Sequence, residues 1–102
     1  MRQMAGILRN NYFSSGEMVA ELPFNLIKDL LDPEDVIIVT AEEMIEGMRL
    51  AAERMKLVIE MSAGAAVAGA LKVTKKFPEV KRIGVVLCGG NVDLQKFASI
   101  LG

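Results

Sequence analysis

The chain of 102 residues contains no histidine, no tryptophan and a single cysteine. Without histidine, a Ser–His or Cys–His nucleophilic pair and an imidazole general base are excluded. One cysteine cannot form an internal disulfide, and a structural zinc site is not expected when histidine is also lacking. We therefore expect no metal site and, from the sparse use of cysteine, a reducing cytoplasmic location.

An excess of one charge and a long apolar run are also absent. Lys and Arg number 12, Asp and Glu number 13, and the net charge is -1. Such a balance does not attract nucleic acid or an anionic membrane, so we expect neither as a partner. The run of small and apolar residues from Met61 to Leu71 is too short to cross a bilayer, and the first residues lack a secretory pattern.

What the chain does contain is 52% hydrophobic residues, enough for the core of one domain. Helical periodicity predicts four helices, at residues 24–31, 44–59, 63–76 and 94–101. Thr40 and Glu43 have the spacing of a capping box, and Ser62 is the expected N-cap of the third helix. Arg49 and Glu53 are four residues apart and could form an ion pair on the second helix. Residues 1–22 show no sustained period and are expected to be poorly ordered.

Two continuous apolar segments, Val36–Val39 and Ile83–Leu87, predict buried strands. Strands that alternate with helices indicate an α/β fold with a parallel sheet. Strands of this kind need cover on both faces and a neighbour on each edge, which two strands cannot supply. We therefore expect residues 23–102 to be part of a larger three-layer domain, or to need a partner chain.

The loop Cys88–Gly89–Gly90–Asn91 is the first candidate site, because parallel sheets bind ligands beyond the carboxyl ends of their strands. Paired glycines permit a positive φ and a close approach of the backbone to a ligand. An ordinary tight turn is the simpler interpretation, since neither a P-loop nor a GxGxxG motif is present.

Other residues allow two interpretations each. Cys88 could be a nucleophile, but no basic residue lies near it in sequence, which favours a packed or ligand-facing thiol. Glu60 stands between two predicted helices and could orient a ligand or cap a helix. Lys56 is typical of a solvated helix residue, and Met44, Met48 and Met55 keep the spacing of a core stripe.

Two segments resemble a known family. ERMKLVIEMSAGAAVAGAL at residues 53–71 and PEVKRIGVVLCGGNVDL at residues 78–94 resemble the C-terminal part of the fold-type II pyridoxal-phosphate enzymes that include serine racemases and serine and threonine ammonia-lyases. LIKDLLDPEDVIIVTAEEM follows the same pattern upstream, so that the resemblance extends over residues 24–97, whereas residues 1–22 are an extension that does not match the family. It implies a fragment of the large α/β domain of these enzymes and pyridoxal 5′-phosphate as the cofactor.

The resemblance also implies roles for individual residues. Cys88 takes the position that hydrogen-bonds the pyridine nitrogen of the cofactor, and Gly89 and Gly90 form the adjacent loop. Glu60 takes a position near the cofactor. A neutral partner such as a thiol leaves the pyridine nitrogen less protonated than a carboxylate would, and this weakens the electron sink.

In family members that bind ATP as an effector, the residues that match Lys56 and Asn91 contact the nucleotide near a dimer interface. The family usually has Pro and Thr where this chain has Met61 and Ser62. The resemblance therefore adds Lys56 and Asn91 as candidate nucleotide ligands, and ATP as a candidate effector.

The family's Schiff-base lysine motif, its substrate loop, its Gly-rich phosphate cradle and its acidic metal ligands have no counterpart in this sequence. One hypothesis is a fragment of a serine racemase or a serine/threonine ammonia-lyase, which acts on a small amino acid only in the full-length enzyme. The alternative is a non-catalytic module that self-associates as a homo-oligomer or pairs with a full-length homologue.

Overall fold

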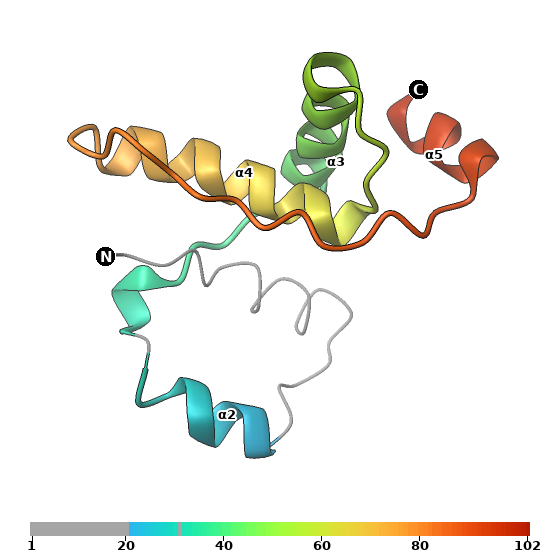
Figure 1. The fold of residues 1–102 in the computed structure, drawn as a ribbon. Helices are drawn as coiled ribbons and strands as arrows, with labels where there is room; N and C mark the ends of the chain where they lie inside the picture. Colours follow the sequence, from blue (N-terminus) through green and yellow to red (C-terminus); the bar gives the residue numbers. More distant parts are fainter. Residues whose placement is uncertain (1–20, 31) are drawn as a thin grey trace.

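The structure, a computed structural model, describes residues 21–30 and 32–102. The regular elements of these residues are helices (Figure 1). In chain order they are α2 (Glu21–Ile27), the 3-10 turn η1 (Pro33–Asp35), α3 (Ala41–Leu50), the π-helical turn η2 (Ala51–Met55), α4 (Met61–Lys76) and α5 (Leu94–Leu101). Helices α3 and α4 pack on each other, and residues 79–93 follow α4 in an extended path. Of the segment expected to be poorly ordered, residues 1–20 lie outside the described residues.

The predicted parallel sheet is wrong for the described part of the chain. Neither Val36–Val39 nor Ile83–Leu87 forms a strand, and no backbone hydrogen bond joins these two described segments. Their β-branched residues favour an extended backbone, but a strand becomes stable only when a neighbour accepts its ladder hydrogen bonds. Instead of a three-layer α/β arrangement, residues 21–30 and 32–102 form packed helices joined by irregular segments.

The capping box at the start of α3 is confirmed. The Glu43 N–H donates to Thr40 Oγ1 at 3.2 Å, and the Thr40 N–H donates to Glu43 Oε2 at 2.7 Å. Lys72 of α4 lies 2.8 Å from the same carboxylate and donates to the Ile38 carbonyl at 2.7 Å. The hydrogen bond from Lys72, together with the Thr40 N–H, lowers the pKa of Glu43. One lysine thus ties the segment before α3 to α4.

The second predicted helix ends earlier than its apolar pattern. After η2, Lys56 adopts the left-handed conformation with φ 58°, and the Leu57 N–H donates to the Ala51 carbonyl at 3.1 Å. This end leaves Met55, Leu57 and Val58 exposed, while Ile59 returns to the core. The stripe predicted from Met44 to Ile59 is therefore wrong between residues 52 and 58, because a π turn and a left-handed residue change the direction of the chain.

The same π turn changes the predicted ion pair. Arg49 pairs with Glu46 at 2.7 Å instead of Glu53, and its second nitrogen donates to the Leu101 carbonyl at 2.6 Å. Glu53 lies in η2, where the wider turn moves it away from the i+4 position of a regular helix. Arg49 therefore holds the end of α5 against α3.

One of the three remaining predicted helices has the bounds that the structure shows. Helix α5 covers Leu94–Leu101 as predicted, and Asp93 caps it by accepting from the Lys96 N–H at 2.9 Å. Helix α4 begins two residues before the prediction, and its N-cap is Glu60 instead of Ser62. The helix predicted at residues 24–31 lies at Glu21–Ile27 and is followed by a turn at residues 28–30.

Two glycines set the distance between α3 and α4. A Cβ built on Gly47 would overlap the Gly64 carbonyl oxygen, and a Cβ on Gly64 would overlap the Met44 carbonyl oxygen. Both glycines are buried, so the two helix backbones touch directly at this crossing. The run of small residues at the start of α4 thus allows another backbone to approach closely.

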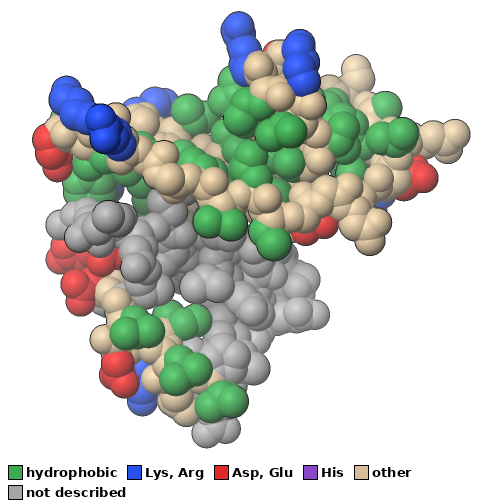
Figure 2. All heavy atoms as spheres, viewed as in Figure 1, with side chains coloured by type: hydrophobic (Ala, Val, Ile, Leu, Met, Phe, Trp, Pro, Cys, Tyr) green, Lys and Arg blue, Asp and Glu red, His purple; other side chains and the backbone are tan. Residues whose placement is uncertain are grey.

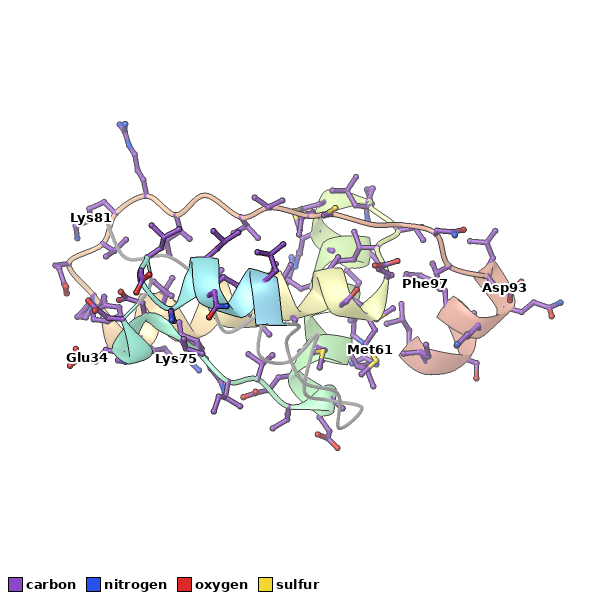
Figure 3. All side chains as sticks on the ribbon, turned by 90° about the horizontal axis from the view of Figure 1, so that it is seen from below. Glu34, Met61, Lys75, Lys81, Asp93 and Phe97 are labelled. Carbon is purple, nitrogen blue, oxygen red and sulfur yellow. The ribbon has the colours of Figure 1, made fainter. Side chains whose placement is uncertain are left out.

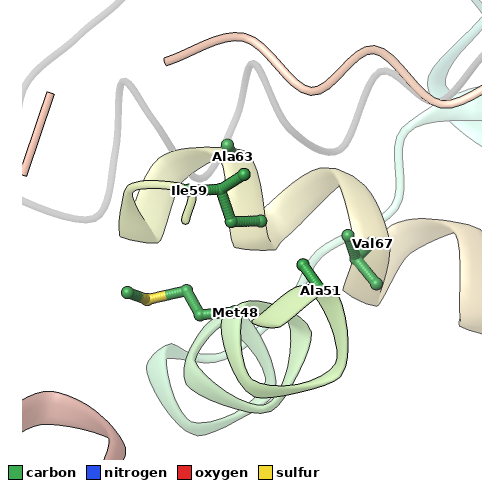
Figure 4. Close-up of a cluster of buried hydrophobic side chains, with 5 residues drawn as sticks. All are labelled: Met48, Ala51, Ile59, Ala63 and Val67. Carbon is green, nitrogen blue, oxygen red and sulfur yellow. The ribbon is translucent and has the colours of Figure 1, made fainter. Parts of the chain in front are cut away.

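The core lies on the two sides of this crossing. One cluster consists of buried side chains from α3, η2, Ile59 and α4, and Figure 4 shows its members: Met48, Ala51, Ile59, Ala63 and Val67. The second cluster joins Val39 and Met44 to Ala65 and Ala68. Leu87 and Phe97 pack on the first cluster, so the extended segment and α5 complete it. The core interpretation of Met44 and Met48 is confirmed.

We expect Gly47→Ala to lower the free energy of unfolding by about 1–3 kcal/mol, because the new methyl forces α3 away from α4. This loss outweighs the gain of about 1 kcal/mol in helix propensity when glycine becomes alanine. The matched control is Gly84→Ala, since a Cβ at Gly84 meets no atom within 4 Å. Urea-induced unfolding measures both variants, and equal stability of the two would contradict the close crossing.

A second prediction concerns Glu43, whose pKa is lowered by Lys72 and the Thr40 N–H. The native state therefore binds a proton at Glu43 less readily than the unfolded chain, so the interaction stabilises above about pH 4.3 and is lost as the pH falls through the lowered pKa. The two side chains are each 38% exposed, so we expect Glu43→Gln to lose at most about 1 kcal/mol at pH 7. That difference from wild type should shrink towards pH 3.

The control for this pH dependence is Glu42→Gln, the same chemical change at the exposed neighbouring position. Urea unfolding at pH 7 and pH 3 should show a pH-dependent difference from wild type for Glu43→Gln only. The same pH dependence in both variants would refute the assignment to the Lys72 contact.

Candidate functional site

The loop at residues 88–91 packs against the turn that joins η2 to α4. The Glu60 N–H donates to the Gly89 carbonyl at 3.2 Å. A Cβ built on Gly90 would lie 2.8 Å from the Val58 carbonyl oxygen, so the two backbones are in contact there. The tertiary structure therefore places the Gly-Gly loop beside Glu60, about thirty residues away in sequence.

Position 89 requires a glycine both for its backbone conformation and because of the atoms around it. Its φ is +104°, which side-chain-bearing residues rarely adopt, and an ideal Cβ would lie 2.5 Å from the Glu60 carboxyl carbon. The Glu60 carboxylate thus takes the space next to Gly89, and it accepts a hydrogen bond from Ser62 Oγ at 2.7 Å. Glu60 and Ser62 are half-buried, so this arrangement holds the carboxylate in one direction.

Glu60 has no cationic partner among the described residues, whose salt bridges join Arg49 to Glu46 and Lys72 to Glu43. It is the N-cap residue of α4, but its side chain makes no capping hydrogen bond. Glu60 thus lies at the cap position of α4 without capping the helix through its side chain, and its carboxylate lies against the loop and Ser62.

Cys88 is exposed and is the residue immediately before Gly89. Within residues 21–30 and 32–102, no hydrogen bond and no basic side chain engages its thiol, so the structure contains no activating partner there. A nucleophilic thiol needs such a partner, whereas a weak, neutral hydrogen-bonding group does not. The geometry favours the second interpretation of Cys88.

The two candidate nucleotide ligands are not brought into contact. Lys56 ends η2, and its Nζ donates to the Glu53 carbonyl at 2.8 Å. Asn91 is exposed at the end of the Gly-Gly loop. Their segments meet where Gly90, the residue before Asn91, contacts the carbonyl of Val58, two residues after Lys56. Lys56 is more than a solvated lysine, since it supplies the left-handed residue that ends the helix.

Two parts of this site were not predicted from the sequence. Ser62 was expected to cap α4, but its hydroxyl donates to Glu60. The Val58 carbonyl contacts the loop through backbone alone, and a backbone contact leaves no signal in residue type. In the described residues, no group of three His, Cys, Asp or Glu side chains could hold a metal ion, and no helix has the length and apolar character to span a membrane.

Comparison with protein families decides which family this site represents. The model of the family described as pyridoxal-phosphate dependent enzyme matches residues 11–89. The chain belongs to this family. The resemblance is confirmed for residues 24–89, and the match begins at residue 11, earlier than the extension expected at residues 1–22 would allow.

Individual relatives agree with this assignment. The chain is 40% identical to a serine racemase of Dictyostelium discoideum over 81% of this chain and 25% of the relative. It is 36% identical to an L-threo-3-hydroxyaspartate ammonia-lyase of Saccharomyces cerevisiae over 81% of this chain and 24% of the relative. A solved structure of a pyridoxal 5′-phosphate-dependent aspartate racemase has a TM-score of 0.59 and 46% identity, over 66% of this chain and 21% of that chain. This member of the pyridoxal-phosphate family thus spans about a quarter of the length of these relatives.

The geometry of the loop leads to a prediction for Gly89→Ala. The methyl group would meet the Glu60 carboxylate, and alanine disfavours a positive φ, so the loop should separate from α4 at a cost of about 1–3 kcal/mol. Hydrogen exchange measures the effect at the Glu60 amide, which donates to the Gly89 carbonyl. We expect its protection to fall about 5- to 150-fold, since every 1.4 kcal/mol corresponds to a factor of ten.

Gly84→Ala is again the control, because it lies in the same extended segment and has open space around it. Its Glu60 amide should keep the protection of the wild type. If Gly89→Ala also keeps that protection, the contact between Gly89 and Glu60 does not hold the loop.

Proposed function

We propose that residues 58–62 and 88–91 form the side of a pyridoxal-phosphate site that faces the pyridine nitrogen, within a serine racemase or a serine/threonine ammonia-lyase. The observation that carries the proposal is the exposed Cys88 next to a glycine whose Cβ position is taken by the Glu60 carboxylate. This combination exposes a thiol on a loop whose shape is set by the contact of Gly89 with Glu60. In this proposal residues 23–102 act as one unit.

The residues fit one edge of the cofactor. Cys88 offers a weak hydrogen-bonding group for a ring nitrogen, and Gly89 and Gly90 let the loop pack closely on Glu60 and on the Val58 carbonyl beside it. Ser62 Oγ donates to the Glu60 carboxylate at 2.7 Å and holds it beside the loop, near the proposed ring edge. When bound, the cofactor supplies an electron sink for the α-carbon of an amino acid, and a neutral partner at the ring nitrogen limits that sink.

The same residues do not complete a catalytic site, and we infer that the chain alone is inactive. The chemistry needs a lysine amine that attaches the cofactor. In the described part of the chain, no lysine amine contacts Cys88, Gly89 or Glu60; Lys56 and Lys72 donate to the Glu53 and Ile38 carbonyls. Lys56 and Asn91 as nucleotide ligands, ATP as an effector and a cytoplasmic location stay predictions.

A second candidate function is an interaction module, and the exposed apolar side chains favour it. Leu22, Leu26 and Leu30 are 72%, 62% and 80% exposed on and after α2. Figure 2 shows hydrophobic side chains at the surface there. Faces of this kind are typical of surfaces that pack on another protein, either a second copy or a full-length homologue.

Complementation separates the two functions. A Dictyostelium serine racemase shortened to the part before the matched region should bind pyridoxal phosphate more tightly when this chain is added. Gly89→Ala should abolish the gain, whereas Cys88→Ser, which keeps a neutral hydrogen-bonding group, should retain it. Equal gains from wild type and Gly89→Ala, or no gain at all, would refute the proposed site.

A second experiment tests the inactivity of the chain alone. We expect incubation with pyridoxal phosphate, borohydride reduction and peptide mass spectrometry to find the label spread over exposed lysines, without turnover of L-serine or L-threonine. Labelling of one lysine together with turnover would show that the chain is an enzyme by itself.

A further inference from the structure

The first turn of α4 offers the Glu60 carboxylate two kinds of hydrogen-bond donor. Glu60 is the N-cap residue, and the first backbone N–H groups of a helix have no partner within the helix. An N-cap side chain ordinarily accepts from one of those N–H groups, and the helix dipole favours a carboxylate there. The Glu60 side chain makes no such bond, and its Oε1 accepts from Ser62 Oγ at 2.7 Å. A hydroxyl therefore holds the carboxylate where backbone groups of the same helix compete for it.

The choice between these donors decides what lies beside Gly89. With the bond to Ser62 in place, the Glu60 carboxyl carbon lies 2.5 Å from the position that a Cβ of Gly89 would take. The Glu60 backbone makes a contact of its own, since its N–H donates to the Gly89 carbonyl at 3.2 Å. A carboxylate that turned to the N–H groups of α4 would leave the space beside Gly89, and the loop would then depend on its backbone contacts.

The backbone between Glu60 and Ser62 is fixed independently of this hydrogen bond. Met61 lies between them at the start of α4 (Figure 3), and its side chain packs on both core clusters. The Gly64 N–H donates to the Glu60 carbonyl at 3.1 Å and closes the first turn of the helix. The Ser62 hydroxyl thus decides the direction of the Glu60 side chain, while the core decides the path of the chain.

We propose that Ser62 is a positioning residue of the candidate cofactor site: its hydroxyl keeps the Glu60 carboxylate against Gly89 and away from the N–H groups of α4. Because Gly89 follows Cys88 directly, this contact fixes the backbone that carries the thiol. The role of Ser62 at the loop stands on the chain itself, whereas its consequence for pyridoxal phosphate rests on the function proposed above. Ser62 acts through Glu60 and not by contact with the cofactor.

Ser62→Ala tests the role at the loop. Without the hydroxyl, the Glu60 carboxylate should turn to α4, and the hydrogen-exchange protection of the Glu60 amide should fall about fivefold, the factor that corresponds to a hydrogen bond of about 1 kcal/mol. The midpoint of urea unfolding should not fall, because alanine has a higher helix propensity than serine and α4 gains a capped N–H group. A loss at the loop without a loss of stability distinguishes positioning from a general structural role.

Two variants and a second amide serve as controls. Ser62→Thr keeps the hydroxyl on the same carbon and should keep the protection of the wild type. Thr74→Ala removes a hydroxyl from the same helix, one that donates to the Leu71 carbonyl at 2.7 Å, and should leave the Glu60 amide unchanged. The Phe77 amide, which is hydrogen-bonded at the end of α4, should keep its protection in Ser62→Ala.

A double-mutant cycle shows whether Ser62 acts through Glu60. Glu60→Ala keeps the backbone amide but removes the carboxylate, so adding Ser62→Ala to it should cause no further loss of protection. Additive losses would show that Ser62 acts on the loop by another route, and they would overturn the proposal. Unchanged protection in Ser62→Ala, the same loss in Ser62→Thr, or an equal loss at the Phe77 amide would overturn it as well.

The consequence for the cofactor is measured with the shortened racemase described above. The gain in affinity for pyridoxal phosphate, followed by the fluorescence of the bound cofactor, should be about fivefold smaller with Ser62→Ala than with wild type, and Ser62→Thr should restore it. A full gain with Ser62→Ala would overturn the role of Ser62 at the cofactor, while a loss with Gly89→Ala would still support the site. No gain with the wild-type chain would refute the cofactor site, and the exchange experiment would still decide the role of Ser62 at the loop.

Discussion

The direct contact between the backbones of α3 and α4 at Gly47 and Gly64 is the constraint on which the other contacts depend. A methyl group on either glycine would overlap the backbone of the opposite helix. Because the backbones touch, the short side chains of Ala51, Ala63 and Ala65 are enough to fill the interface on both sides. Larger residues at the crossing would separate the helices and leave these alanines without contacts, with a loss of dispersion energy at each.

The crossing also positions the candidate site. Helix α4 begins at Met61, and Lys56 in its left-handed conformation turns the chain so that Ile59 enters the core and Glu60 faces the Gly-Gly loop. The loop is held there by the Glu60 N–H and by contact with the Val58 carbonyl. The packing of two helices thus brings together an acidic residue and a thiol-bearing loop that are far apart in sequence. The family membership gives this arrangement its chemical meaning.

Local elements could be predicted where the signal lies within a few residues. The Thr40–Glu43 capping box and the bounds of α5 are correct because hydrogen bonds between residues three or four apart decide them. The end of the second helix was not predictable, since its apolar pattern continues through Met55 and Val58 while the chain turns at Lys56. Lysine as a residue type gives no indication that it will adopt the left-handed conformation. The cap of α4 was missed for a related reason: Ser62 is a good capping residue, but the Glu60 carboxylate accepts its hydrogen bond.

The sequence by itself determined the capping box of α3, the bounds of α5, the family and the glycines of the loop, because periodicity, motif and residue type are properties of short stretches. The tertiary structure alone decided that the apolar segments Val36–Val39 and Ile83–Leu87 form no strand with any other described residue, since a strand depends on the hydrogen bonds of a neighbour and not on its own residues. It also decided that Gly89 lies against Glu60, because only the crossing of α3 and α4 sets where the start of α4 meets the loop. Close approach of two backbones is a property of the packed chain, and only the packed chain shows which of the nine glycines it requires.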